Sequence, residues 1–555
     1  MGKAGRLVQS NHRLLLFLLL LFLTTKVCIS QTFPTSDYFK NIINQPAPPT
    51  QIPAPQGLKE LVVSGELRMT LEDAIRLMLM NNTNVRMNQL DLETSRWAVV
   101  RTYRPFDPIG RASFNATRAT TPSNVATEGA VTRSDLDQQT QLGYSQTFQT
   151  GTRFDTSYDT FRSSTNNVFS YYNPSIASNL NFSLTQPMLR NRGLFPNQAP
   201  IVIARRNLNQ TRANFEAQIN EAISTVVNQY WAVVGARENI KVQQTALQMA
   251  EVTYKHNQRE LELGALPPLD IFRSESQVAS RRVDVIRAEY ALKQAEDALR
   301  QTLGADLDMD VRNLKLDLIE KVEAAGELMK VNLEEALQQA LSRRPELEAL
   351  RQQLANSDTS IRLAHNNLQP DLGFSLFYTG SGQSGDQFDL NTTPPALISQ
   401  GGVGDSLGQI VRLQYPTYGF SFQLNLPIKN RAAQADLGAA LVDKRRGLYG
   451  MRKLEQTIGL EVRNAANQLE QTKLSMAAAK VARDLAQKTL EAEQRKYELG
   501  VSQIFFVLDA QTQLSQSELS FLQAQISYQL AVADLDRATG GLLERHRVQV
   551  NEATN

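Results

Sequence analysis

The heptapeptide Gln258-Arg-Glu-Leu-Glu-Leu-Gly264 recurs in the same chain as Gln494-Arg-Lys-Tyr-Glu-Leu-Gly500, at an offset of 236 residues (494 − 258). The same register continues without gaps to Gly304 and Gly540. A gapless register of this length indicates that the chain contains an internal duplication rather than two helices of similar composition.

A second pair of segments supports the duplication and locates an insertion. Thr70-Leu-Glu-Asp-Ala-Ile75 matches Asn332-Leu-Glu-Glu-Ala-Leu337 at an offset of 262 residues (332 − 70). The offset therefore falls by 26 residues (262 − 236) between the two matches. The first copy must hold these extra residues around 119–178, where the sequence is rich in Ser, Thr, Asn and Gly and is typical of surface loops.

The segments before the repeated turns have the composition of very long helices. Residues 203–263 contain one Gly and no Pro, and at 1.5 Å per residue they predict a rod of about 90 Å. The counterpart, roughly 432–498, also lacks Pro. Such lengths exceed those of globular helices and favour coiled-coil packing. Apolar residues also recur every seven positions in the helices that follow the turns: Val278, Val285, Leu292 and Leu299 in the first copy, and Leu514, Phe521, Tyr528 and Leu535 in the second.

Three segments alternate apolar and polar residues without any charge: 180–185, 372–378 and 418–426. This pattern is expected of strands that face lipid on one side and a lumen on the other, although a soluble β-sandwich produces the same alternation. The predicted export of the chain favours the membrane interpretation. Because so few strands cannot close a barrel within one chain, closure would require several protomers.

The first thirty residues, 1–30, are predicted to be a secretory signal peptide. Three basic residues precede the apolar run 14–23, which spans only about 15 Å as a helix and is too short for a membrane anchor. We place cleavage before Gln31; the alternative is a lipoprotein signal ending at Cys28. Residues 31–66 contain six prolines and predict an extended N-terminal leader.

Composition excludes several classes of function. Lys and Arg total 58 against 56 Asp and Glu, so no charge imbalance indicates binding to nucleic acid. The chain has one Cys and four His, which rules out a Cys-rich zinc site or a disulfide framework. We also find no nucleophile or phosphate-loop motif, and we therefore expect no enzyme activity, no cofactor and no metal site.

These features together resemble the TolC family of outer-membrane efflux proteins over about 67–543. The most specific pieces are Tyr497-Glu-Leu-Gly500 followed by Val507-Leu-Asp-Ala-Gln511, and the strand exits Leu184-Thr-Gln-Pro187 and Leu424-Asn-Leu-Pro427. The resemblance implies a first repeat at 67–304, an equatorial inter-repeat segment at 305–331, a second repeat at 332–543 and a C-terminal tail at 544–555.

The resemblance implies a mainly α fold with a membrane β part. Long coiled-coil helices would form an α-barrel across the periplasm, and a homotrimer would share one β-barrel in outer-membrane lipid. Four strands per protomer is the family pattern. Here Leu142–Phe148 and Phe154–Tyr158 could form an added hairpin, and whether it joins the barrel stays open. The implied partners are a periplasmic membrane-fusion (adaptor) protein and an inner-membrane pump of the RND or ABC type.

The resemblance also implies a gate at the periplasmic helix tips, near the turns at Gly264 and Gly500. The family places an Asp, here Asp270, where it hydrogen-bonds a Tyr, here Tyr497. An Arg that the family has two residues after the second turn Gly is replaced by Ser502.

Two further positions at the implied entrance can be acidic in the family. The first is Phe506 and the second is Asp509 in this chain. Three copies of Asp509 around a narrow opening would favour cations, and three copies of Phe506 would add an apolar constriction. An alternative role for Asp270 is simply to cap the helix that follows the turn.

The most probable function by this argument is the outer-membrane channel of a tripartite efflux or type I secretion system, a passive conduit driven by its pump. The alternative is a periplasmic coiled-coil adaptor without a pore, which would share the export signal and the rods but would lack alternating strands free of charge. The cargo is not encoded in any motif, because in such systems the energised pump selects it.

Overall fold

The computed structural model describes residues 52, 54–122, 131–263, 268–322, 329–392 and 394–548. The chain divides into Met1–Ala54 and Pro55–Asn555, and all the elements below belong to the second unit. The predicted signal peptide and most of the leader lie outside the described residues. Within the part of the chain that is described, none of the helices combines the length and the apolar character needed to cross a bilayer.

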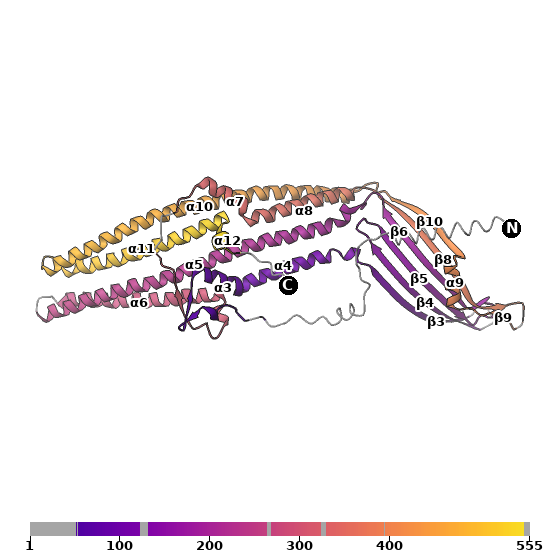
Figure 1. Ribbon diagram of the computed structural model, residues 1–555, viewed down its shortest axis with the longest axis horizontal. Coiled ribbons are helices and arrows are strands. Elements are labelled where there is room, and N and C mark those ends of the chain that lie inside the picture. The colour runs from indigo at the N-terminus through magenta and orange to yellow at the C-terminus, as the bar shows by residue number, and fades with distance from the viewer. Residues whose placement is uncertain are drawn as a thin grey trace. The chain divides into compact units, whose positions relative to one another are not determined.

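The helices of the two sequence copies correspond one to one (Figure 1). Those of the first copy are α3 (Leu71–Asn81), α4 (Thr83–Arg101), α5 (Leu194–Glu262) and α6 (Pro268–Leu303). Their counterparts are α7 (Leu333–Arg343), α8 (Pro345–Asn367), α10 (Arg431–Glu498) and α11 (Ile504–Thr539). The short elements are η1 (Lys59–Leu61), η2 (Arg104–Phe106), η4 (Ala305–Leu307), α9 (Val403–Val411) and α12 (Leu542–Arg545). The predicted duplication is therefore confirmed.

The long helices form two hairpins, α5–α6 and α10–α11, and α5 also packs against α11. Helix α5 has 69 residues and α10 has 68, so α5 begins earlier than the predicted residue 203. The sequence argument began after Pro200, but this proline lies inside α5. Most of the predicted seven-residue pattern is buried: Val278, Val285, Leu299, Leu514, Tyr528 and Leu535 are all less than a tenth exposed.

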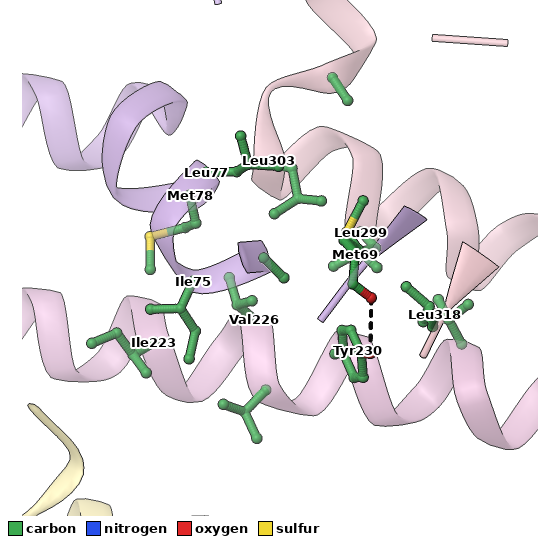
Figure 2. Close-up of a cluster of buried hydrophobic side chains, with 14 of the residues drawn as sticks. Met69, Ile75, Leu77, Met78, Ile223, Val226, Tyr230, Leu299, Leu303 and Leu318 are labelled. Atoms are coloured by element: carbon green, nitrogen blue, oxygen red, sulfur yellow. Dashed lines mark hydrogen bonds between the residues drawn. The ribbon is translucent and has the colours of Figure 1, made fainter. Parts of the chain in front are cut away.

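A small sheet and the largest apolar core lie near the middle of the helices. The strands β1 (Val62–Val63), β2 (Glu66–Met69) and β7 (Lys315–Leu318) pair in the order β1-β2-β7, and β2 is parallel to β7. Met69 and Leu318 pack here with Tyr230, whose hydroxyl donates to the Met69 carbonyl at 3.4 Å (Figure 2). Regular structure thus begins before residue 67, where the first repeat was predicted to start, because β1 and β2 complete this core.

The second sheet is built mainly from six long antiparallel strands in the order β10-β8-β6-β5-β4-β3, with the short β9 (Ala396–Ser399) paired to β8. The long strands are β3 (Ile109–Pro122), β4 (Thr132–Thr147), β5 (Arg153–Thr165), β6 (Tyr172–Pro187), β8 (Asp371–Asp389) and β10 (Tyr415–Asn425). The three predicted charge-free segments fall in β6, β8 and β10. The possible hairpin at 142–158 falls in β4 and β5, and it is part of the sheet.

The interpretation of 119–178 as surface loop is wrong for 132–165, which form β4 and β5. Polar side chains in a strand need only one aqueous face, so Ser- and Thr-rich composition does not by itself indicate a loop. The first copy consequently supplies four of the long strands and the second copy two. One extra hairpin accounts for the additional residues of the first copy.

The register aligns apolar side chains on one face across the sheet. Phe420 lies opposite Leu376, which lies opposite Leu184, and Leu184 lies opposite Phe154. The neighbouring residues Ser421, Ser375, Thr185 and Arg153 follow the same register on the other face. The rings of Phe374, Phe420 and Phe422 contact one another on the apolar face. The sheet therefore has one apolar and one polar face, as a bilayer-spanning wall requires.

Candidate functional site at the helix tips

The turn of the second hairpin is fixed by a helix C-cap. Gly500 has φ +71°, in the left-handed region that favours glycine. Its N–H donates to the Tyr497 carbonyl at 2.9 Å, and the N–H of Val501 donates to the Lys496 carbonyl at 3.0 Å. Helix α11 then begins at Ile504. In the first hairpin α5 ends at Glu262 and α6 begins at Pro268, and Gly264 lies outside the described residues.

Tyr497 links the two hairpins just before this turn. Its hydroxyl donates to the Glu260 carboxylate of α5 at 2.6 Å, and the amide oxygen of Asn257 lies 3.3 Å from the same hydroxyl. Asn257 in turn donates to Ser274 Oγ of α6 at 2.5 Å. Both Asn257 and Ser274 are buried. A polar network thus joins α5, α6 and α10 within a few residues of the tip.

Tyr497 remains a hydrogen-bond donor at physiological pH. Burial raises the pKa of the Tyr497 hydroxyl well above its usual value, and the hydrogen bond to Glu260 and the nearby charge of Asp270 raise it further. The ring also contacts that of His256, whose Nε2 lies 3.1 Å from the Glu260 carboxylate. The tip therefore gathers an acid, a phenol and an imidazole from two different helices.

Asp270 does not make the hydrogen bond that the resemblance implied, because Tyr497 binds Glu260 and Asn257 instead. Asp270 lies in the first turn of α6, its carboxylate is 3.6 Å from Arg273, and its backbone carbonyl accepts from Ser274 Oγ at 3.2 Å. Glu260 reaches Tyr497 directly because it lies on α5, one turn beyond Asn257 on the same side of the helix. Asp270 is thus connected to Tyr497 through Ser274 and Asn257.

The remaining predicted residues lie on α10 and α11 around the turn. Ser502 donates to the Glu493 carboxylate at 3.0 Å, and Lys496 lies 2.6 Å from the same carboxylate. Hydrogen bonds from Lys496 and Ser502 lower the pKa of Glu493. Asp509 accepts from Gln513 at 2.8 Å. Ser502, which replaces the family Arg, therefore makes a contact within its own hairpin.

Phe506 lies outside the apolar core of the tip. It is 50% exposed and its ring meets that of Phe505, which is equally exposed, edge to face at 5.5 Å. The adjacent Ile504 and Val507 are buried with Leu490 and Leu514. This division leaves two aromatic rings at the start of α11 without cover from their own chain's core.

The sequence argument missed Glu260, Asn257 and Ser274. A polar residue such as Asn257 at a position that later proves to be buried is a signal for a network, but it requires knowledge of which face of α5 is covered. The duplicated turn placed Tyr497 correctly at the tip, whereas its partner depends on how α5 is rotated against α10.

These features define a class: a duplicated helical hairpin protein with a two-faced antiparallel sheet. The outer membrane efflux protein family matches residues 152–305 and 336–541, and the chain belongs to this family. The predicted resemblance is thereby confirmed, and the chain is an outer-membrane protein of a family of transport proteins.

Individual relatives agree with this assignment. The toluene efflux pump outer membrane protein TtgC of Pseudomonas putida is 21% identical over 335 residues, which are 60% of this chain and 62% of the relative. The chain thus matches about three fifths of that relative's length. The outer membrane protein TolC of Vibrio cholerae is 23% identical over 353 residues, 63% of this chain and 74% of the relative. The solved structure of CusC superposes with a TM-score of 0.62 at 18% identity, covering 89% of this chain and 99% of that chain, which shows the same fold.

Proposed function

We propose that this protein is the outer-membrane channel of a tripartite efflux or type I secretion system. It would act as a passive conduit from the periplasm to the exterior, driven by an inner-membrane pump of the RND or ABC type. A periplasmic adaptor would dock at the helix tips. Family membership supports this proposal, and the adaptor alternative is disfavoured by the long two-faced sheet.

The observation that carries the proposal is the state of the two sheet edges. Strands β3 and β10 each pair on one side only, and nearly every residue in both is exposed. In lipid, an unpaired strand edge would leave backbone groups without hydrogen bonds at a cost of several kcal/mol each, roughly. The sheet must therefore close against other copies of itself.

The strand directions permit this closure. Because the six long strands alternate in direction, β3 and β10 run antiparallel to each other at opposite edges. The β10 edge of one protomer can therefore pair with the β3 edge of the next in an antiparallel ladder. We propose a homotrimer, with the apolar face of the sheet towards lipid and the polar face towards a shared lumen.

Cysteine cross-linking tests this arrangement, since the only Cys of the sequence, Cys28, lies in the predicted signal peptide. Ser113→Cys on β3 is combined in turn with Thr417→Cys, Ser421→Cys or Gln423→Cys on the same face of β10. One combination should give covalent trimers on oxidation in outer-membrane fractions. Phe420→Cys, on the opposite face, is the control and should not cross-link to Ser113→Cys. A stable monomer that needs no detergent would refute the architecture.

At the helix tips we propose that Tyr497, Asp270, Phe506 and Asp509 contribute to a gate that opens on docking. Closure of this kind requires interactions of only a few kcal/mol, roughly, so a polar network suits it better than a packed plug. Three copies of Asp509 near the opening would attract cations within a Debye length of about 8 Å at physiological salt. Asp509→Asn should lower cation selectivity in planar bilayers, and unchanged selectivity would place this carboxylate outside the pore.

A further inference from the structure

The hairpin β4–β5 is fully integrated into the large sheet. Strand β4 pairs with β3 from Thr132 to Ser145, and β5 pairs with β6 from Arg153 to Ser163. The two strands of the hairpin also pair with each other along almost their whole length. Continuous pairing on both sides means that the hairpin is part of the wall and does not fold over it.

The hairpin also has the same two faces as the rest of the wall. Leu142 lies opposite Tyr158, which lies opposite Leu180 on the apolar face. Gln141 lies opposite Asp159, and Ser157 lies opposite Asn181, on the polar face. The rings of Tyr144 and Phe154 are 6.3 Å apart on the apolar face. An insertion that carries this alternation is built to stand between lipid and water.

Parity allows the hairpin to be inserted without disturbing its neighbours. Two antiparallel strands restore the direction of the chain, so β3 and β6 remain antiparallel to each other with or without them. Following the register across, Ile109 lies level with Ser145, Asp155 and Ser183, all on the polar face. The faces of β3 and β6 therefore still match when the hairpin is left out.

We infer that the hairpin β4–β5 widens the exit of the channel so that it passes bulkier hydrophilic cargo. This inference rests on the proposed trimeric channel. Six strands from each of three protomers give an 18-stranded barrel, whereas four from each would give 12. Because barrel diameter grows roughly linearly with strand number, the exit is about 1.5 times as wide. Barrels of about 16–18 strands leave an aqueous channel that side chains do not fill.

The polar face of the hairpin suits a water-filled exit. Asp155 pairs with Arg153 at 2.9 Å, and Asp159 accepts from Ser157 at 2.8 Å and from Asn181 at 3.0 Å. Charged and amide groups in such number require hydration, which a packed interior does not supply. The added strands thus enlarge the lumen with hydrophilic surface and favour soluble cargo over apolar compounds.

The first test asks whether the hairpin lies in the wall. Single cysteines are introduced on the polar face as Gln141→Cys or Ser157→Cys, and on the apolar face as Leu142→Cys or Tyr158→Cys. A water-soluble maleimide should label the first pair in membranes and should not label the second, because a lipid-facing thiol is shielded. Labelling of all four positions would place the hairpin outside the membrane and would overturn the inference.

The second test measures the width of the exit directly. Ser183→Cys on the polar face of β6 is labelled from outside the cell with maleimide–polyethylene glycols of graded mass, in the full chain and in a variant lacking 132–165. The deletion should abolish labelling by the larger polymers and preserve labelling by the smallest. The periplasmic gate does not affect this measurement, because the polymers enter from the exterior.

The outcomes separate the two proposals. If trimers form and the size limit is the same in both proteins, the hairpin does not set the width, and the inference fails while the channel proposal stands. If the full chain forms no membrane-inserted trimer, the channel proposal fails. Should the deletion variant not assemble, the labelling pattern of the four hairpin cysteines in the full chain still decides whether these strands form the wall.

Discussion

At the scale of single residues, the contact between Tyr497 and Glu260 determines how the two hairpins are held at the tip. A hydrogen bond to a charged group contributes about 1.5–3 kcal/mol when it is shielded, and partial exposure of this pair places its value near about 1 kcal/mol. We therefore predict a coupling energy of about 1 kcal/mol in a double-mutant cycle of Tyr497→Phe and Glu260→Gln. Hydrogen exchange of the tip amides supplies the local opening free energies.

Asp270→Asn provides the matched control for this cycle. Since Asp270 reaches Tyr497 only through Ser274 and Asn257, its coupling to Tyr497→Phe should be much smaller. Tyr497→Phe should also raise single-channel conductance if the network holds the gate closed. A stronger coupling to Asp270 than to Glu260 would contradict the assignment of the hydroxyl's partner.

The pH dependence of the same bond follows from the raised pKa of Tyr497. A folded-state pKa above the usual value of 10 stabilises the protonated phenol, so its contribution is fully present below about pH 10. The contribution is lost as pH rises from there towards the folded pKa. The difference between the parent and Tyr497→Phe should therefore stay constant between about pH 6 and 9, and a difference that vanishes within this window would exclude the phenol as the donor.

The same residues show what the sequence can and cannot provide. Gly500 and Tyr497 were located correctly at a turn because a helix end has a local signature. Glu260 was missed because its role depends on the rotation of one long helix against another, which no local pattern specifies. A family correspondence placed Asp270 near the tip, but it assigned the wrong hydrogen-bond partner to Tyr497.

At the scale of elements, the packing of α9 on the sheet depends on small residues. A Cβ on Gly382 would lie 2.1 Å from the Ser406 carbonyl oxygen, and Ser406 Oγ hydrogen-bonds Ser178 Oγ at 2.8 Å. We predict that Gly382→Val displaces α9 and exposes the buried Ser406. The readout is thiol labelling of Ser406→Cys, which should be slow in the parent and fast with Gly382→Val.

Gly373→Val on the same strand is the control, because a Cβ there meets no atom within 4 Å. It should leave Ser406→Cys protected. If Ser406→Cys reacts equally slowly in all three backgrounds, α9 does not depend on the close approach at Gly382.

Elements were predictable where their period was strong. The long helices and the strands β6, β8 and β10 follow from composition and alternation alone. Strand β3 was missed because Phe114 is its only aromatic residue, and β4–β5 was recognised only in part because charges such as Arg153 and Asp159 interrupt the apolar pattern. Helix α9, with three glycines between 402 and 408, has no helical signature in the sequence.

At the scale of the whole molecule, duplication explains both the symmetry and the departure from it. The two copies supply equivalent helical hairpins, whereas the sheet receives four long strands from the first copy and two from the second. Helices that pack along their length must stay matched, but a sheet can gain a hairpin without altering its neighbours. The proposed barrel is therefore the part of the assembly most free to change its size.

The orientation of this sheet in the bilayer gives the last prediction. Phe422 lies on the apolar face, is 62% exposed and packs its ring 4.9 Å from that of Phe374. The next residue, Gln423, lies on the polar face. An Arg on the lipid face near the bilayer midplane costs about 2–4 kcal/mol, whereas lumen positions tolerate charge. Phe422→Arg should therefore lower the unfolding free energy by about 2–4 kcal/mol per protomer, and Gln423→Arg should change it little. Urea titration of the trimer folded in lipid vesicles measures both values, and equal losses would mean that these strands do not contact a bilayer.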